Sequence, residues 1–110
     1  TEQGKPVLSF GVMGGDYQPL GQARVISNLF DHGRNLQGVL DAPRVFPLGD
    51  VVEVERSVPT EVLRGLAGKG HTLRLAEDPL GGAQAIRIDH ARGTLIGASA
   101  PRKDGCVAGY

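Results

Sequence analysis

The sequence contains no tryptophan, a single cysteine and few aromatic residues, and these absences narrow the ways in which the chain can be stabilised. Because a disulfide needs two thiols, Cys106 cannot form one within the chain. Neither Cys106 nor the three histidines have the spacing that a metal site uses, so we expect no metal and no other cofactor. With so few large aromatic side chains, the core must be built from Val, Leu, Ile and Ala.

An excess of one charge and a long apolar run are also absent. Lysine and arginine number 12 and aspartate and glutamate 12, so there is no basic face of the size that nucleic acid or an anionic membrane would bind. No apolar stretch approaches the roughly 20 residues needed to span a bilayer, and the N-terminal TEQGKP is unlike a secretory signal. We therefore expect a soluble chain without a nucleic-acid partner or a membrane segment, in either the cytoplasm or the periplasm.

Glycine and proline, in contrast, are frequent, with 17 and 7 copies, and they fall between patterned segments. At 110 residues the chain is near the common size of one domain, so we expect a single domain over residues 1–110. The most unusual stretch is FGVMGGDYQPLG, in which Gly14 and Gly15 follow a strand-like run. Glycine is unfavourable within a strand, so this pair indicates either a positive φ or a close approach of the backbone to another group.

The first part of the chain predicts a strand followed by two helices. The apolar run VLSFGVM, residues 7–13, has strand length and lacks strict alternation, as expected for a central strand buried on both faces. After the glycine pair, Asp16 can cap a helix of about fourteen residues, and Pro19 can occupy its first turn. Asn35 is expected to begin a second, shorter helix that ends before Pro43.

The second part predicts strands separated by one helix. VVEVE, residues 51–55, alternates as a half-exposed strand does. A helix capped by Ser57 or Thr60 and closed by the glycines at 68–70 leads to the strand TLRLAE. AQAIRID and TLIGAS then form an antiparallel hairpin with Gly93 in its turn. The chain is therefore expected to have an α+β fold with a mostly antiparallel sheet and flanking helices.

Gly14 and Gly15 lie where a strand meets the start of a helix, so their backbone N–H groups could stabilise an oxyanion, as in acyl-transfer enzymes. From spacing alone, a plain tight turn is the favoured interpretation. A second glycine pair, at 81–82, precedes a strand and is interpreted as its turn. Arg44 and Arg102 each follow proline in an APR sequence, and we interpret both as structural clamps that bind carbonyls or carboxylates.

Other reactive side chains receive structural interpretations. Thr1 could act as a nucleophile with its own α-amine as the base, but TEQGKP is unlike the rigid strand end that such a residue needs. No catalytic triad is indicated, because none of the histidines has a Ser, Cys or Asp at a suggestive local spacing. We interpret the remaining candidates as solvated, capping or packed residues, namely Asp16, His32, Asp41, His71, His90 and Cys106.

Several motifs in a fixed order are more specific together than any one of them. They are GVMGG (11–15), NLQGVLDAPR (35–44), EVLRGLAGKGH (61–71), GGAQAI (81–86), GTLIGASAPR (93–102) and AGY (108–110). In this order they resemble the C-terminal part of the small, catalytic subunit of the γ-glutamyltransferase (γ-glutamyltranspeptidase) family. The resemblance covers nearly the whole chain and implies part of the four-layer αββα sandwich of the N-terminal-nucleophile hydrolases.

The resemblance also implies a reaction. Members of this family form by autocatalytic cleavage of a precursor, and a threonine freed at the N-terminus of the small subunit attacks a γ-glutamyl amide such as glutathione. The acyl group then passes to water or to the amine of an amino acid or peptide. Gly14 and Gly15 match the glycine pair whose backbone N–H groups form the oxyanion hole, where a Cβ would block the substrate carbonyl.

The chain departs from the family pattern in two respects. The nucleophilic threonine and the serines that bind the substrate lie upstream of the glycine pair in the family, in segments that this sequence lacks, so Thr1 is not expected to be the catalytic threonine. Val12 and Met13 replace the Ser-Pro often found before the glycines, and DYQPLGQ is similar to bacterial members, which leaves the acyl donor open between glutathione and another amide.

These features together predict a fragment that supplies the oxyanion hole and is inactive alone. Its expected partners are the large subunit, the remainder of the small subunit and a γ-glutamyl small molecule, and the isolated fragment is expected to self-associate. The alternative is a non-catalytic binding or assembly module that retains the fold.

Overall fold

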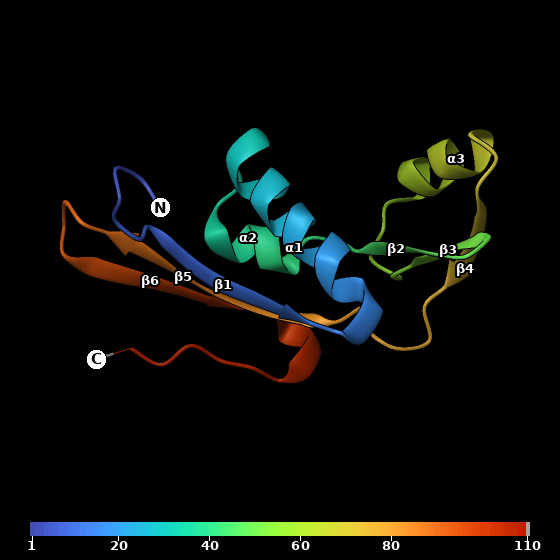
Figure 1. The fold of residues 1–110 in the computed structure, drawn as a ribbon. Helices are drawn as coiled ribbons and strands as arrows, with labels where there is room; N and C mark the ends of the chain where they lie inside the picture. Colours follow the sequence, from blue (N-terminus) through green and yellow to red (C-terminus); the bar gives the residue numbers. More distant parts are fainter. Residues whose placement is uncertain (110) are drawn as a thin grey trace. The chain divides into compact units, whose positions relative to one another are not determined.

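The computed structural model describes residues 1–109, and its contacts divide the chain into two compact units. The first unit joins Thr1–Asp41 to the residues from Gly81 onward, and the second is Ala42–Leu80. The expectation of a single domain over 1–110 stays a prediction, and the last residue of the AGY motif lies outside the described residues. Figure 1 shows the elements of both units along the chain.

The sheet of the first unit consists of strands β1 (Leu8–Met13), β5 (Gly82–Asp89) and β6 (Thr94–Ser99), in the order β1-β5-β6. Both pairings are antiparallel, and the predicted hairpin of β5 and β6 is confirmed. The predicted first strand is also confirmed, but its central, doubly buried position is wrong. β1 lies at an edge of this sheet, and side chains along it alternate between partly buried or buried and exposed. The run looked continuous because Gly11 and Met13 occupy exposed positions.

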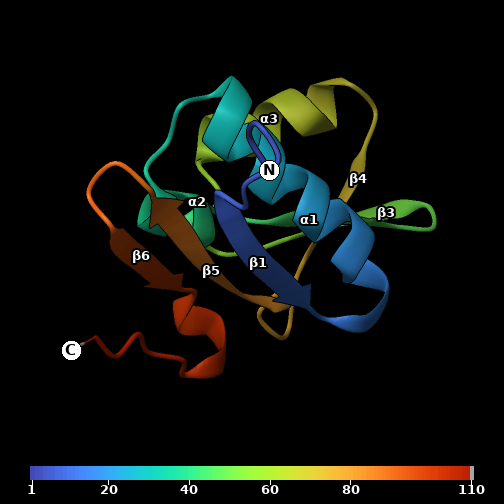
Figure 2. The ribbon, with the colours of Figure 1, turned by 60° about the vertical axis from the view of Figure 1, so that its left-hand side comes forward.

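Helical segments cover one face of this sheet, as Figures 1 and 2 both show. They are helix α1 (Gln18–Ile26) and helix α2 (Leu36–Asp41); the short turn η1 (Gly15–Tyr17) leads into α1, and the π-helical turn η2 (Ser27–Asp31) follows it. Proline occupies the start of α1, as expected, but Asp16 does not cap it, because no side chain caps this helix. Asn35 does cap α2, since its Oδ1 accepts a hydrogen bond of 2.7 Å from the Gly38 N–H.

Apolar side chains from the helices and from the covered face of the sheet form the core of this unit. Gly21 of α1 lets the helix approach β1 closely, because a Cβ there would lie 2.7 Å from a Val12 methyl group and 2.6 Å from the Tyr17 ring. Leu40 of α2 lies in this core with no exposed surface. The other buried residues of this core include Val12, Tyr17, Val25, Leu36, Val39, Ala83, Ala85 and Ala98.

The second unit contains strands β2 (Val45–Leu48), β3 (Val51–Val54) and β4 (Thr72–Leu75), with helix α3 (Thr60–Gly68) between β3 and β4. β2 pairs antiparallel with β3, and β3 pairs parallel with β4. The predicted alternation of the VVEVE strand is confirmed, and its inward residues Val52 and Val54 form a core with Val58. The predicted cap of α3 is wrong, because the helix follows Pro59 and no side chain caps it.

Candidate functional site

The first glycine pair lies directly after the last hydrogen-bonded position of β1. The β1–β5 ladder ends where Met13 pairs with Gly82, and the backbone then turns sharply. Gly14 has φ +130° and Gly15 has φ +57°, and the turn η1 begins at Gly15. The Tyr17 N–H closes this turn by donating a hydrogen bond of 3.1 Å to the Gly14 carbonyl. Positive φ is therefore one reason for both glycines.

Gly14 also makes the close backbone approach that the sequence indicated as the second reason for such a pair. A Cβ built on Gly14 would lie 2.9 Å from the Cα of Gly81, nearer than side chains tolerate. At Gly15 the same construction meets no atom within 4 Å among the described residues, so this residue borders open space. The structure thus gives a reason for glycine at position 14 that involves the second glycine pair and no substrate.

The backbone N–H groups of the pair are available as donors. Among the turn and loop hydrogen bonds recorded in residues 1–109, none is donated by the N–H of Gly14 or Gly15. Fixed N–H dipoles beside open space can stabilise negative charge that develops on a carbonyl oxygen during acyl transfer. The role of Gly14 and Gly15 as an oxyanion hole stays a prediction.

Both arginines of the APR sequences act as structural clamps on backbone carbonyls. In the first unit, the Arg102 guanidinium donates a hydrogen bond of 2.7 Å to the Leu40 carbonyl near the end of α2. In the second unit, Arg44 is only 5% exposed and donates a hydrogen bond of 2.6 Å to the Leu80 carbonyl. These two interpretations from the sequence are confirmed.

The other candidate side chains do not assemble around the glycine pair. Thr1 is exposed and precedes a short bridge between Glu2 and Lys5. Nε2 of His90 lies 2.8 Å from the Pro6 carbonyl oxygen, and Cys106 is exposed. Within residues 1–109, no group of three His, Cys, Asp or Glu side chains is placed to hold a metal ion. No helix in that range is long and apolar enough to cross a membrane.

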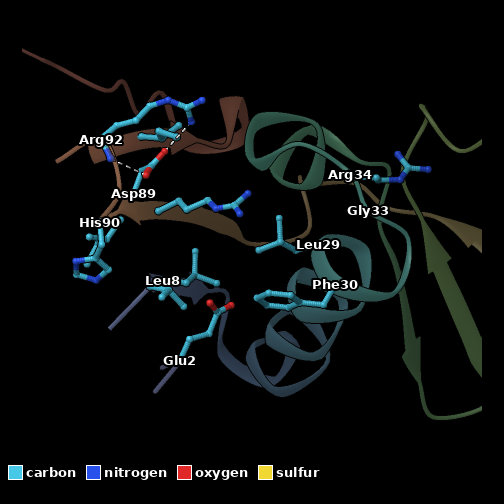
Figure 3. A pocket seen from close by; sticks show the side chains of 13 residues that line it. Glu2, Leu8, Leu29, Phe30, Gly33, Arg34, Asp89, His90 and Arg92 are labelled. Atoms are coloured by element: carbon cyan, nitrogen blue, oxygen red, sulfur yellow. Dashed lines mark hydrogen bonds and ion pairs between the residues drawn. The ribbon is translucent and has the colours of Figure 1, made fainter. Parts of the chain in front are cut away.

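A hollow of about 560 Å³ lies at the opposite end of the β1–β5 pair from the glycines, and Figure 3 shows it from close by. Its apolar wall includes Leu8, Leu29 and Phe30. The carboxylate of Asp89 lies at its rim and forms an ion pair of 2.9 Å with the Arg92 guanidinium. Sequence analysis missed this hollow, because its walls come from separate segments and no local motif marks it.

Comparison with known proteins gives a consistent result. The family described as gamma-glutamyltranspeptidase matches this chain over residues 1–110. The acylase ACY 1 proenzyme of Pseudomonas sp. (strain V22) is 39% identical over 82 residues, which cover 74% of this chain and 14% of that protein. The glutathione hydrolase-like YwrD proenzyme of Bacillus subtilis (strain 168) is 33% identical over 115 residues, covering 96% of this chain and 22% of that protein.

A solved structure gives the same result for the fold. The crystal structure of cephalosporin acylase from Bacillus halodurans aligns with a TM-score of 0.92 and 39% identity, and covers 100% of this chain and 21% of that chain. The chain therefore spans between 14% and 22% of the length of these three proteins.

Proposed function

Since the chain belongs to the gamma-glutamyltranspeptidase family, we propose that it is the part of an autoprocessed acyl-transfer enzyme that supplies the oxyanion hole. Its α+β fold is part of the four-layer sandwich of the N-terminal-nucleophile hydrolases. The Pseudomonas and Bacillus subtilis relatives reported above are both named proenzymes. These names support formation of the parent protein, meaning the natural protein that contains this chain, by cleavage of a precursor.

The proposed reaction proceeds through a covalent intermediate. A threonine of the parent protein, outside this chain, attacks the carbonyl carbon of an acyl amide, and the amine leaves with a proton. Water or the amine of an amino acid or peptide then attacks the acyl-threonine ester and releases the threonine hydroxyl. In both steps the N–H groups of Gly14 and Gly15 donate to the oxyanion, an interaction worth roughly 10²–10³ in rate per donor. The conformation of this pair is the observation that carries the proposal.

The isolated chain is proposed to be inactive because it lacks the nucleophile. Thr1 is exposed, and it lies only thirteen positions before Gly14, whereas the family's nucleophile is expected well upstream of the glycine pair. The proposed partners are the other segments of the parent protein, namely its large subunit and the remainder of its small subunit. Hydrolysis of an acyl amide by the pure chain, abolished by Thr1→Ala, would contradict this part of the proposal.

A γ-glutamyl amide such as glutathione is the proposed acyl donor, because the matching family and the Bacillus subtilis relative both carry that chemistry in their names. A second candidate is a different acyl amide, since two proteins that are 39% identical to this chain are named acylases. The two candidates share the nucleophile and the oxyanion hole and differ in the acyl group that is bound.

The test is to express the full gene product of the parent protein and to follow its intact mass over time. We expect cleavage into two chains, the smaller one beginning with threonine, followed by hydrolysis of a γ-glutamyl anilide. An N-acyl cephalosporin, assayed in parallel, identifies the second candidate if it is the better substrate. A natural product that stays uncut and inactive on both amides would favour the binding-module alternative.

A further inference from the structure

We infer that Gly81 is a positioning residue, which fixes the backbone of Gly14 so that its N–H can meet a reacting carbonyl oxygen. The inference rests on the oxyanion-hole role proposed above. It assigns a function to the second glycine pair, which the sequence alone suggested to be only the turn before a strand.

The first observation is the contact between the two pairs. Gly14 and Gly81 are the first residues beyond the β1–β5 ladder, whose last pair is Met13 with Gly82. The position where a Cβ of Gly14 would lie is 2.9 Å from Gly81 Cα and 3.4 Å from Gly81 N. The Gly81 backbone therefore fills the side of Gly14 from which a side chain would project.

The second observation is that Gly81 is itself held in place. It is buried and has φ +66°, an angle that few residues other than glycine adopt. A Cβ on the adjacent Gly82 would lie 2.7 Å from Cγ of Lys103 and 3.3 Å from Cγ of Met13. Lys103 belongs to the turn η3 (Pro101–Lys103), so side chains from two other segments pack against the second glycine pair.

These contacts support Gly14 from one side only. At the neighbouring Gly15, a Cβ would meet no atom within 4 Å among the described residues, so no comparable contact is found there. A donor must stay fixed as charge develops, and a displacement of about 1 Å can cost roughly 10²-fold in rate. A change at Gly81 should therefore lower kcat more than it raises KM, because the oxyanion interaction strengthens in the transition state.

The experiment compares Gly81→Ala and Gly81→Asn with the same substitutions at Gly93, in the processed parent protein. Gly93 is a matched control because it has φ +64°, close to the φ of Gly81, but lies in the β5–β6 turn with open space around its Cβ direction. Alanine strains both positions, whereas asparagine tolerates the left-handed angle at both. Intact mass first verifies that each variant is cleaved, and kcat and KM are then measured separately on the preferred amide.

We expect Gly81→Ala to lower kcat by about 10- to 100-fold with KM changed by about twofold or less. Gly81→Asn relieves the backbone strain but still adds a side chain at a buried position, so it should also lower kcat, and both Gly93 variants should keep the kcat of the unmodified enzyme. Equal kcat for Gly81→Ala and Gly93→Ala would overturn the inference. If Gly81→Ala does not fold, the kcat of Gly81→Asn is compared with that of Gly93→Asn, because asparagine adds a Cβ to a buried residue only at position 81. Equal kcat for these two variants would overturn the inference in the same way. An unmodified parent without amide-cleaving activity would instead overturn the proposed function.

Discussion

At the scale of single residues, the two glycines of the first pair are required for different physical reasons. Gly14 has φ +130° and no room for a Cβ, because the backbone of Gly81 occupies that space. Gly15 has φ +57°, which is the left-handed helical region, and its Cβ direction is open. Asparagine adopts the left-handed helical region but not an angle near +130°, so one substitution separates the two cases.

We therefore predict that Gly14→Asn destabilises the parent protein by about 2–4 kcal/mol, while Gly15→Asn costs about 1 kcal/mol or less. The larger cost combines backbone strain with displacement of a neighbouring segment. Thermal unfolding of the two purified variants, monitored by circular dichroism, measures the difference. If Gly14→Asn and Gly15→Asn lose the same stability, the contact with Gly81 does not determine which residues position 14 can hold.

At the scale of elements, one carboxylate joins the two ends of the second unit. Glu55 Oε2 accepts a hydrogen bond of 2.9 Å from the Arg44 N–H, and Oε1 accepts one of 3.2 Å from the Leu80 N–H. Arg44 lies near the beginning of this unit, and Leu80 is its last residue. The alternating pattern of residues 51–55 predicts an exposed side for Glu55, opposite Val52 and Val54, whereas the structure gives its carboxylate two backbone N–H partners from distant positions in the sequence.

Removal of this carboxylate should loosen the second unit. Glu55→Ala leaves two backbone N–H groups without this acceptor, which costs about 1–3 kcal/mol when such groups are buried. Hydrogen exchange at Leu80 should become faster in this variant. Glu61→Ala is the matched control, because Glu61 is an exposed residue of α3. If exchange at Leu80 is as slow in Glu55→Ala as in the control, the carboxylate does not hold the two ends together.

The β5–β6 turn provides a prediction about pH. Hydrogen bonds to Asp89 from the backbone N–H and then the guanidinium of Arg92 hold the pKa of this carboxyl below its ordinary value. Because the pKa of Asp89 is lower in the folded chain, its hydrogen bonds contribute to the free energy of unfolding above the carboxyl's unfolded pKa, about 3.9. This contribution is lost as the pH falls through the lower pKa of the folded chain. The NMR shifts of the Ala91 and Arg92 amides should follow this loss in acid. Asp89→Asn should abolish the titration, and Asp50→Asn, in the other hairpin turn, should preserve it.

The elements also show which features of the fold and the site a sequence can predict. The β5–β6 hairpin was predictable because Gly93 separates two runs of strand residues that pair locally. β2 was missed because Pro47 interrupts its pattern, although proline is tolerated on an edge strand such as this one. The pairing of Gly14 with Gly81 was not predictable, because it depends on contact between segments separated by most of the chain. The clamps of Arg44 and Arg102 were predictable as a type of interaction, but their carbonyl partners were not.

At the scale of the molecule, the face of the β1-β5-β6 sheet that the helices leave uncovered carries large apolar side chains. Met13, Ile86 and Leu95 are 44%, 45% and 69% exposed. The register places all three on this face, because side chains alternate along each strand and paired residues share a side. Part of the face lies against the C-terminal segment, where Val107 packs onto Gly97. Figure 1 shows this segment running along the side of the sheet away from α1 and α2.

An apolar face and an edge strand together promote association, because they offer both hydrophobic area and unpaired backbone groups. We predict that the isolated 110-residue chain self-associates and binds the dye ANS, and that Ile86→Lys with Leu95→Lys reduces both effects. Val62→Lys is the control, because Val62 is similarly exposed, at 44%, but belongs to α3 of the second unit. Light scattering over a range of concentrations measures the association. A monomer that does not bind ANS would show that this face is closed within the chain itself, so that the rest of the parent protein is not needed to cover it.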